Sequence, residues 1–109
     1  MEEQEILLEN VDVQVWYLKD VETYGAVNQA HADFMGKEKN ALENNSVWEI
    51  MSTEEEAEAC IEDNRKVFEE KSQIETEERI LDGEGEERIL SITKSPKVDE
   101  KGEVEFVVC

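Results

Sequence analysis

Basic side chains are scarce in this chain. Lysine and arginine supply 11 of its 109 residues, whereas aspartate and glutamate supply 30, so the net charge is −19. A surface of this charge repels the phosphates of nucleic acids and the headgroups of anionic lipids. We therefore expect neither nucleic acid nor a membrane surface as a partner. The acidic residues favour solubility, and they would also suit a basic partner protein.

Long hydrophobic runs are missing as well. No stretch approaches the ~20 apolar residues that cross a membrane. The first five residues, MEEQE, are acidic where a secretion signal would be basic. Cys60 and Cys109 are the only cysteines, and their spacing fits neither a metal site nor a redox motif. We therefore expect a reduced, cytoplasmic protein.

The residues of familiar catalytic sites are also few. His31 is the only histidine, and the chain has no Gly-x-Ser-x-Gly motif and no phosphate-binding loop. One histidine and two distant cysteines do not make a structural zinc site. We predict no enzymatic activity for the domain and no bound metal, and we expect His31 to be exposed or to help cap a helix.

The hydrophobic residues, 39% of the chain, suffice for one modest core in a single domain. In some segments they alternate with a period of two, and in others they follow the helical repeat. The predicted strands are residues 11–18, 23–27, 74–81, 86–95 and 104–108. The predicted helices are residues 2–10, 29–35 and 52–72, with a partly helical stretch at 37–45 and no assignment for 47–51. This order predicts an α+β domain with helices packed on one face of an antiparallel sheet.

Turn residues separate the predicted strands. We expect turns at residues 19–22, 82–85 and 99–102. The last two contain glycine and aspartate, which are typical turn residues. Pro96 lacks a backbone N–H and cannot donate to a strand ladder. We therefore expect the fourth strand to end or bend there.

The helix predicted at 52–72 has a polar residue on its apolar side. Ser52 with Glu55, or Thr53 with Glu56, could cap its first turn. Its apolar stripe is formed by Ala57, Cys60, Ile61, Asn64, Val67 and Phe68. Asn64 interrupts this stripe, and a polar group facing a sheet is costly unless it is hydrogen-bonded. It would bond a neighbouring backbone group or a water, or it would contact a ligand.

Several short motifs occur in a characteristic order along the chain. Asn28 is suited to cap the helix at 29–35 and Gly36 to end it. The motifs are Val15-Trp16-Tyr17-Leu18, Asn28-x-Ala30-x-x-x-Phe34-x-Gly36, Ser46-Val47-Trp48-Glu49-Ile50, Val67-Phe68, Glu77-Glu78-Arg79, Asp82-Gly83-Glu84-Gly85-Glu86, Thr93-Lys94-Ser95-Pro96 and Asp99-x-x-Gly102-Glu103-Val104. Together they resemble a PAS domain, the small sensory module of histidine kinases and diguanylate cyclases.

The resemblance covers roughly residues 7–109 and implies a PAS fold, in which helices pack on one face of a five-stranded antiparallel sheet. It assigns residues 1–10 to a linker or cap helix and residues 11–109 to the domain. Such domains usually have a longer last strand, followed by an Asp-x-Thr segment. Because this chain stops at Cys109, we expect it to be part of a longer signalling protein.

The resemblance also implies a sensory function. A small molecule or a partner would bias the packing of the helices on the sheet, and an effector domain of the parent protein would respond. The residues that we expect to line the ligand pocket, or simply to fill the core, are Trp16, Tyr24, Phe34, Trp48, Asn64, Phe68, Ser91 and Thr93. Ser91 and Thr93 would be partners of Asn64 if their side chains face inward.

No cofactor is expected. A haem-binding relative would carry its axial histidine on the long helix, which here has none. A flavin-binding light sensor would have an Asn-Cys-Arg-Phe-Leu-Gln run before Val47, which residues 39–44 do not resemble.

The alternative function is a ligand-free dimerisation module. Ile6, Leu7 and Val11 would form an apolar ridge near the N-terminus, and a second copy of the chain would cover it. A complete core without a cavity would favour this interpretation over ligand sensing.

Overall fold

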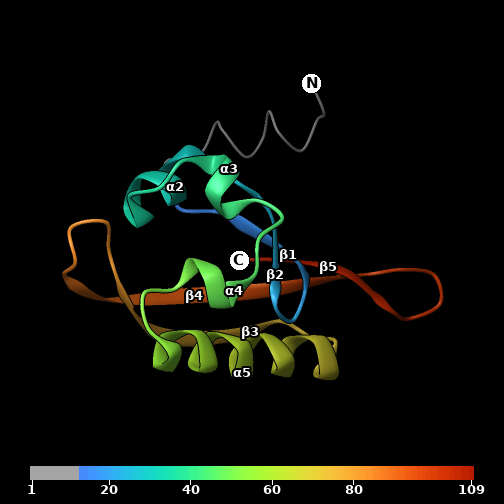
Figure 1. Ribbon diagram of the computed structural model, residues 1–109. Coiled ribbons are helices and arrows are strands. Elements are labelled where there is room, and N and C mark those ends of the chain that lie inside the picture. The colour runs from blue at the N-terminus through green and yellow to red at the C-terminus, as the bar shows by residue number, and fades with distance from the viewer. Residues whose placement is uncertain (1–12) are drawn as a thin grey trace.

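The computed structural model describes residues 13–109, and Figure 1 shows their arrangement. The strands are β1 (Trp16–Asp20), β2 (Thr23–Val27), β3 (Ile74–Leu81), β4 (Glu87–Val98) and β5 (Val104–Val108). The helices are α2 (Gln29–Met35), α3 (Lys39–Leu42), α4 (Val47–Ile50) and α5 (Glu54–Glu70). The strand order in the sheet is β2-β1-β5-β4-β3, and all four pairings are antiparallel. The predicted α+β class and five-stranded antiparallel sheet are confirmed.

The core lies between the sheet and the helices. The longest helix, α5, packs against β3, β4 and β5 and contacts α4. Five residues of the predicted stripe are buried, and the sixth, Phe68, is partly buried; the five are Ala57, Cys60, Ile61, Asn64 and Val67. Among the residues that the structure describes, no helix is both long and apolar enough to cross a membrane.

The first strand begins later than predicted. It runs from Trp16 to Asp20. Residues 13–15 of the predicted strand 11–18 therefore lie outside β1, and residues 19 and 20 of the predicted turn belong to it. The reason lies in Asn28, whose side chain bonds Val13 O at 2.7 Å and Val15 N at 3.1 Å. Together with one backbone bond, from Asn28 N–H to Val15 O at 3.0 Å, these side-chain bonds hold the segment before Trp16.

The fourth strand passes through Pro96, where the sequence predicted that it would end or bend. β3 pairs with β4 only as far as Lys94, and beyond that residue β4 is paired with β5 alone. Proline is tolerated where one side of a strand is open, because no ladder bond is lost there. β4 therefore continues to Val98.

The helix ends follow their caps. α5 begins at Glu54 because Thr53 Oγ1 accepts the backbone N–H of Glu56 at 3.1 Å, so of the two possible caps the second is used. It ends at Glu70, and the next residue, Lys71, caps it with a left-handed φ of 56°. α4, for which no structure was predicted, is a single short helix whose cap is Ser46.

One backbone contact ties the helical layer to the sheet. The N–H of Gly83, in the turn between β3 and β4, donates to the carbonyl of Phe34 in α2 at 2.8 Å. A Cβ atom on Gly83 would lie 2.6 Å from Gly36 Cα, so this approach requires glycine. The contact holds α2 against the hairpin whose strands carry the interior charges described next.

Candidate functional site

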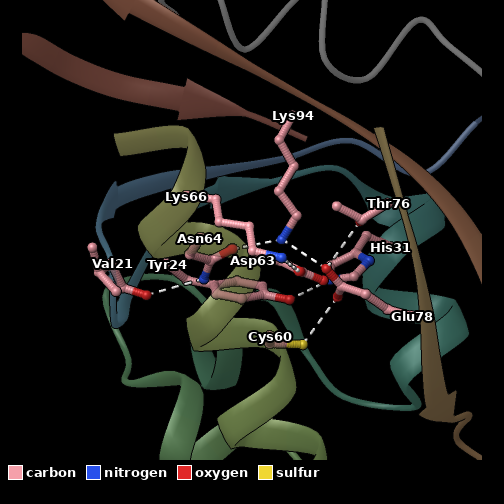
Figure 2. Close-up of polar contacts among 10 residues, drawn as sticks. All are labelled: Val21, Tyr24, His31, Cys60, Asp63, Asn64, Lys66, Thr76, Glu78 and Lys94. Carbon is pink, nitrogen blue, oxygen red and sulfur yellow. Dashed lines mark hydrogen bonds and ion pairs between the residues drawn. The ribbon is translucent and has the colours of Figure 1, made fainter. Parts of the chain in front are cut away.

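A salt bridge lies in the interior of the domain, between α5 and the sheet (Figure 2). Lys94 Nζ and Glu78 Oε2 are 2.9 Å apart, and their side chains are 2% and 3% exposed. They come from the neighbouring strands β4 and β3. Each occupies an inward position of its strand, two residues from a buried isoleucine, Ile92 or Ile80. The alternation of the strands therefore places both charges in the core.

Asn64 of α5 joins this pair. Lys94 Nζ donates to Asn64 Oδ1 at 2.5 Å, and Asn64 Nδ2 donates to the carbonyl of Val21 at 3.0 Å. The bond to backbone is one of the alternatives predicted for Asn64, and the bond to Lys94 adds to it. Within the described residues, two of the three ammonium protons of Lys94 thus have a partner.

Glu78 has two further donors. Cys60 Sγ donates to Oε1 at 3.0 Å, and Thr76 Oγ1 donates to Oε2 at 3.3 Å. Burial, and then the charge of Glu78, raises the pKa of the Cys60 thiol, which stays protonated. Burial and Glu78 also raise the pKa of Asp63, at the edge of the cluster.

Lys94 is charged despite its burial. Burial is the largest single effect and would lower the pKa of its ammonium, but Glu78, Cys109 and Cys60 together outweigh it and raise the pKa. The interior therefore holds a charged ammonium group within salt-bridge distance of Glu78. We call Cys60, Asn64, Glu78 and Lys94 the interior cluster.

A second chain of hydrogen bonds begins beside the interior cluster. Tyr24 Oη lies 3.0 Å from His31 Nε2, and His31 Nδ1 lies 2.8 Å from Gln14 Oε1. The imidazole is stacked on Trp16, with ring centroids 4.1 Å apart and an interplanar angle of 17°. Burial raises the pKa of Tyr24 and lowers that of His31 to about 3, so both groups are neutral.

The expected exposure of His31 is wrong. Its side chain is fully buried, because α2 turns it, with Ala32 and Met35, toward the core. Its backbone does take part in capping, since His31 N–H donates to the side chain of Asn28 at 3.0 Å. Among the described residues, no group of three or more histidine, cysteine or acidic side chains could hold a metal ion.

The cluster borders a cavity of only about 10 Å³. Its lining residues are Trp16, Leu18, Tyr24, Val47, Met51, Cys60, Asn64, Glu78, Ile80 and Lys94. Two open grooves are larger. One, of about 570 Å³, lies between residues 13–16 and β4, and the other, of about 500 Å³, lies between α5 and β3.

Three of the eight residues predicted to line a pocket meet at this cavity, namely Trp16, Tyr24 and Asn64. Phe34 and Phe68 are partly buried against the core and do not line it. Trp48 is 45% exposed, and its indole N–H donates to Glu22 at 2.9 Å, so it belongs to the surface.

Ser91 and Thr93 do not reach Asn64. The inward positions of β4 are Ile92 and Lys94. Ser91 and Thr93 alternate with them and are therefore exposed on the other face. They line the open groove beside residues 13–16 instead. Ile6, Leu7 and Val11, the predicted dimer contacts, lie outside the described residues.

Sequence reasoning missed Glu78 and Lys94. The available signal was strand alternation, since Glu78 and Ile80 share one face of β3, and Ile92 and Lys94 share one face of β4. In a chain with 30 acidic residues, a single glutamate on a strand attracts no attention.

Comparison with known proteins comes to the same fold. A family model described as PAS fold matches residues 8–109. The PAS domain of Bordetella pertussis BvgS is 16% identical, with a TM-score of 0.80, over 96% of this chain and 79% of that one. The Cronobacter turicensis RpfR quorum-sensing receptor PAS domain in complex with BDSF is 18% identical, with a TM-score of 0.69, over 94% and 93%.

A third solved structure extends beyond the part shared with this chain. Vibrio cholera VqmA, in a complex with ligand and DNA, is 18% identical with a TM-score of 0.80; the match covers 97% of this chain but 48% of that one. A search of the curated proteins finds no match. At these identities the solved structures support the fold alone.

Proposed function

Because this chain belongs to the PAS family, we propose that it is the sensory domain of a signalling protein and that it recognises a small molecule at the interior cluster. An effector domain, such as that of a histidine kinase, would respond to the resulting change in packing. The RpfR and VqmA structures support this proposal, because they are described as complexes with a ligand. The role proposed is regulatory rather than catalytic.

The buried pair of Glu78 and Lys94 is the observation that carries the proposal. Removing two charges from water costs several kcal/mol per ion, and their attraction repays this only with good geometry. Apolar residues of similar volume often stabilise a core as well or better. A domain of this size therefore gains little stability from the pair, whereas a pair beside a cavity gives a polar ligand a charged group to bind.

The cluster favours a ligand with a hydrogen-bond acceptor. The third ammonium proton of Lys94 and the second amide proton of Asn64 are donors that the described residues leave for a ligand. The cavity is too small for a metabolite in this packing, so binding requires Met51 and its neighbours to move. Methionine side chains repack readily. Such a ligand would favour the expanded packing by its greater affinity for it, which is what a sensor requires.

A thermal-shift screen with small carboxylic acids, alcohols and amides tests this function, with mass spectrometry of the purified protein for bound molecules. The decisive variant is the double substitution Glu78→Leu with Lys94→Met, which removes both charges and leaves an apolar core. The matched control is Glu77→Leu with Lys97→Met, because these residues occupy exposed positions on the same two strands.

We expect compounds that stabilise the natural protein and the control but not the double variant. A stabilisation that is equal in all three proteins would place binding elsewhere. If no compound co-purifies with the protein or stabilises it, ligand sensing loses its support.

The alternative is a ligand-free PAS module that acts through dimerisation. The small cavity favours it, as does the finding that every buried side-chain nitrogen and oxygen in the described part has a partner. Sedimentation at several concentrations tests it, with Leu7→Glu as the disruptive variant. Dimers that dissociate in the variant would support a homodimer through the N-terminal residues, and monomers throughout would exclude it.

A further inference from the structure

We propose that Tyr24, His31 and Gln14 form a hydrogen-bond relay that carries a change in the interior cavity to residues 13–15, which precede β1. This inference rests on the proposed sensory function and names the residues that would transmit the signal. In it His31 is a positioning residue, which acts through its two neighbours.

The direction of each hydrogen bond follows from the partners. Gln14 Oε1 can only accept, so the His31 nitrogen 2.8 Å away, Nδ1, carries the proton and donates it. The ring is neutral, and its Nε2 therefore has a free lone pair, which accepts the hydroxyl proton of Tyr24 at 3.0 Å. One arrangement of protons satisfies all three side chains.

The inner end of the relay lies at the cavity of about 10 Å³ beside the interior cluster. Tyr24 lines the cavity together with Glu78 and Lys94. A ligand group in the cavity could accept the hydrogen bond of the Tyr24 hydroxyl. His31 Nε2, inside the core, would then have no donor. A buried polar atom without a partner is costly, so the imidazole has to respond. Stacking on Trp16 limits tilting of the ring.

The remaining response is an exchange of protons. The ring loses the proton on Nδ1 to water and takes one from water on Nε2, so its charge does not change. Nε2 can then donate to the Tyr24 oxygen, and Nδ1 needs a donor in place of an acceptor. Gln14 supplies one by turning its amide through 180°, which places its NH₂ group where its oxygen was.

The outer end of the relay is tied to the segment that precedes β1. Gln14 lies between Val13 and Val15, whose backbone groups are both held by the Asn28 side chain. The same oxygen of Asn28 accepts the N–H of His31, so the backbone and the ring of His31 are linked to the same short segment. Gln14 also lines the open groove of about 570 Å³ with Ser91 and Thr93. A turn of its amide changes the donors that this groove presents.

Nitrogen-15 NMR of the single histidine tests the relay in the ligand-free protein. We expect a neutral ring with its proton on Nδ1, because Gln14 Oε1 accepts a hydrogen bond there and the Tyr24 hydroxyl donates to Nε2. Tyr24→Phe removes the inner donor, and it should shift the signals of the His31 ring and of the Gln14 side-chain amide. Tyr17→Phe is the control, because Tyr17 stacks on Phe106 and makes no contact with the relay.

Gln14→Leu tests the relay from its outer end. Because Gln14 is only partly buried, this variant does not disturb the core, and it can serve if Tyr24→Phe proves unstable. It removes the acceptor of Nδ1–H, and we expect loss of the preference for the Nδ1–H tautomer together with a shift at Tyr24. A proton on Nε2 in the natural protein would overturn the proposal. So would an unchanged His31 ring in both variants, or equal shifts in the Tyr17→Phe control.

The relay and the sensory function can fail separately. Compounds that bind at the interior cluster while leaving the His31 tautomer and Gln14 unchanged would refute the relay alone. An intact relay in a protein that binds none of the screened compounds would refute ligand sensing alone.

Discussion

The two faces of the β3–β4 hairpin carry the same kind of ion pair in different surroundings. On the inner face, Glu78 and Lys94 are 2.9 Å apart with side chains 3% and 2% exposed. On the outer face, Arg79 and Glu87 are 3.1 Å apart with side chains 72% and 57% exposed. The distances are nearly equal, but water screens the outer pair and does not reach the inner one. Burial, rather than distance, therefore decides what each pair contributes.

The largest expected effect is that of Lys94→Met. This change leaves the Glu78 carboxylate buried without its cation, which typically costs about 3–5 kcal/mol. We expect a loss of that size in the free energy of unfolding, measured by urea denaturation. Lys97→Met on the exposed part of the same strand should change it by less than about 0.5 kcal/mol.

The double variant Glu78→Leu with Lys94→Met separates the cost of an unpaired charge from the worth of the pair. We expect it to recover most of the stability that Lys94→Met loses, because apolar side chains can replace a buried pair. A double variant as unstable as the single one would mean that the pair itself stabilises the fold, which would weaken the argument that it is kept for binding.

The sequence predicts the sheet better than it predicts the interior. β3 and β5 have the predicted bounds, since their alternation and the turns beside them agree. Asn64 was recognised because an amide interrupts an apolar helical stripe. Glu78 and Lys94 were not, because a charged residue on a strand has the same appearance whether its face is buried or exposed. Only the pairing of β3 with β4 and the position of α5 decide which face is buried.

His31 shows the effect of burial on a single titratable group, and pH measures it. Burial lowers its pKa from 6.5 to about 3, so the unfolded chain binds a proton that the folded chain rejects. Stability from this group is therefore fully present above pH 6.5 and is lost as the pH falls toward 3. At about pH 5 the loss should be about 2 kcal/mol.

Urea denaturation between neutral pH and about pH 5 measures this loss. His31→Gln is the comparison, because it removes the only histidine and leaves every carboxylate in place. We expect a weaker pH dependence in the variant, by the same ~2 kcal/mol. Equal slopes for the two proteins would show that the pKa of His31 is the same in the folded and unfolded states.

Gly83 shows that an exposed residue can still be closely packed. The turn that holds it is exposed, yet a methyl group on Gly83 would lie 2.6 Å from Gly36 Cα and 2.8 Å from Gly36 N. Gly83→Ala must therefore separate α2 from the hairpin and weaken the bond to Phe34. We expect a loss of about 1–3 kcal/mol, typical of overpacking.

Gly85→Asn is the control for Gly83→Ala. It lies in the same turn with a φ of 80°, which asparagine tolerates, and nothing lies within 4 Å of its Cβ position. Amide hydrogen exchange at residue 83 provides a local measurement. An unchanged exchange rate in Gly83→Ala would mean that the contact with α2 had survived.

The cap of α5 has a smaller expected effect. Thr53 accepts the N–H of Glu56, so Thr53→Ala should cost about 1 kcal/mol in urea denaturation. Ser52, the other possible cap in the sequence, is exposed and precedes the cap residue. Ser52→Ala should therefore leave stability within about 0.5 kcal/mol of the natural protein. A reversal of these two values would place the start of the helix one residue earlier.

Arg79→Gln, on the outer face, should have the smallest effect. Exposed pairs contribute about 0–1 kcal/mol, because water and salt screen them. The substitution also removes one of only 11 basic residues from a chain of net charge −19, so repulsion among the carboxylates should add to the loss at low salt. The Debye length shortens from about 30 Å at 0.01 M salt to about 10 Å at 0.1 M. The effect of Arg79→Gln should accordingly shrink as salt is added, whereas that of Lys94→Met should hardly change. An Arg79→Gln effect that persists at high salt would show that packing of the arginine side chain, rather than its charge, is what the outer face uses.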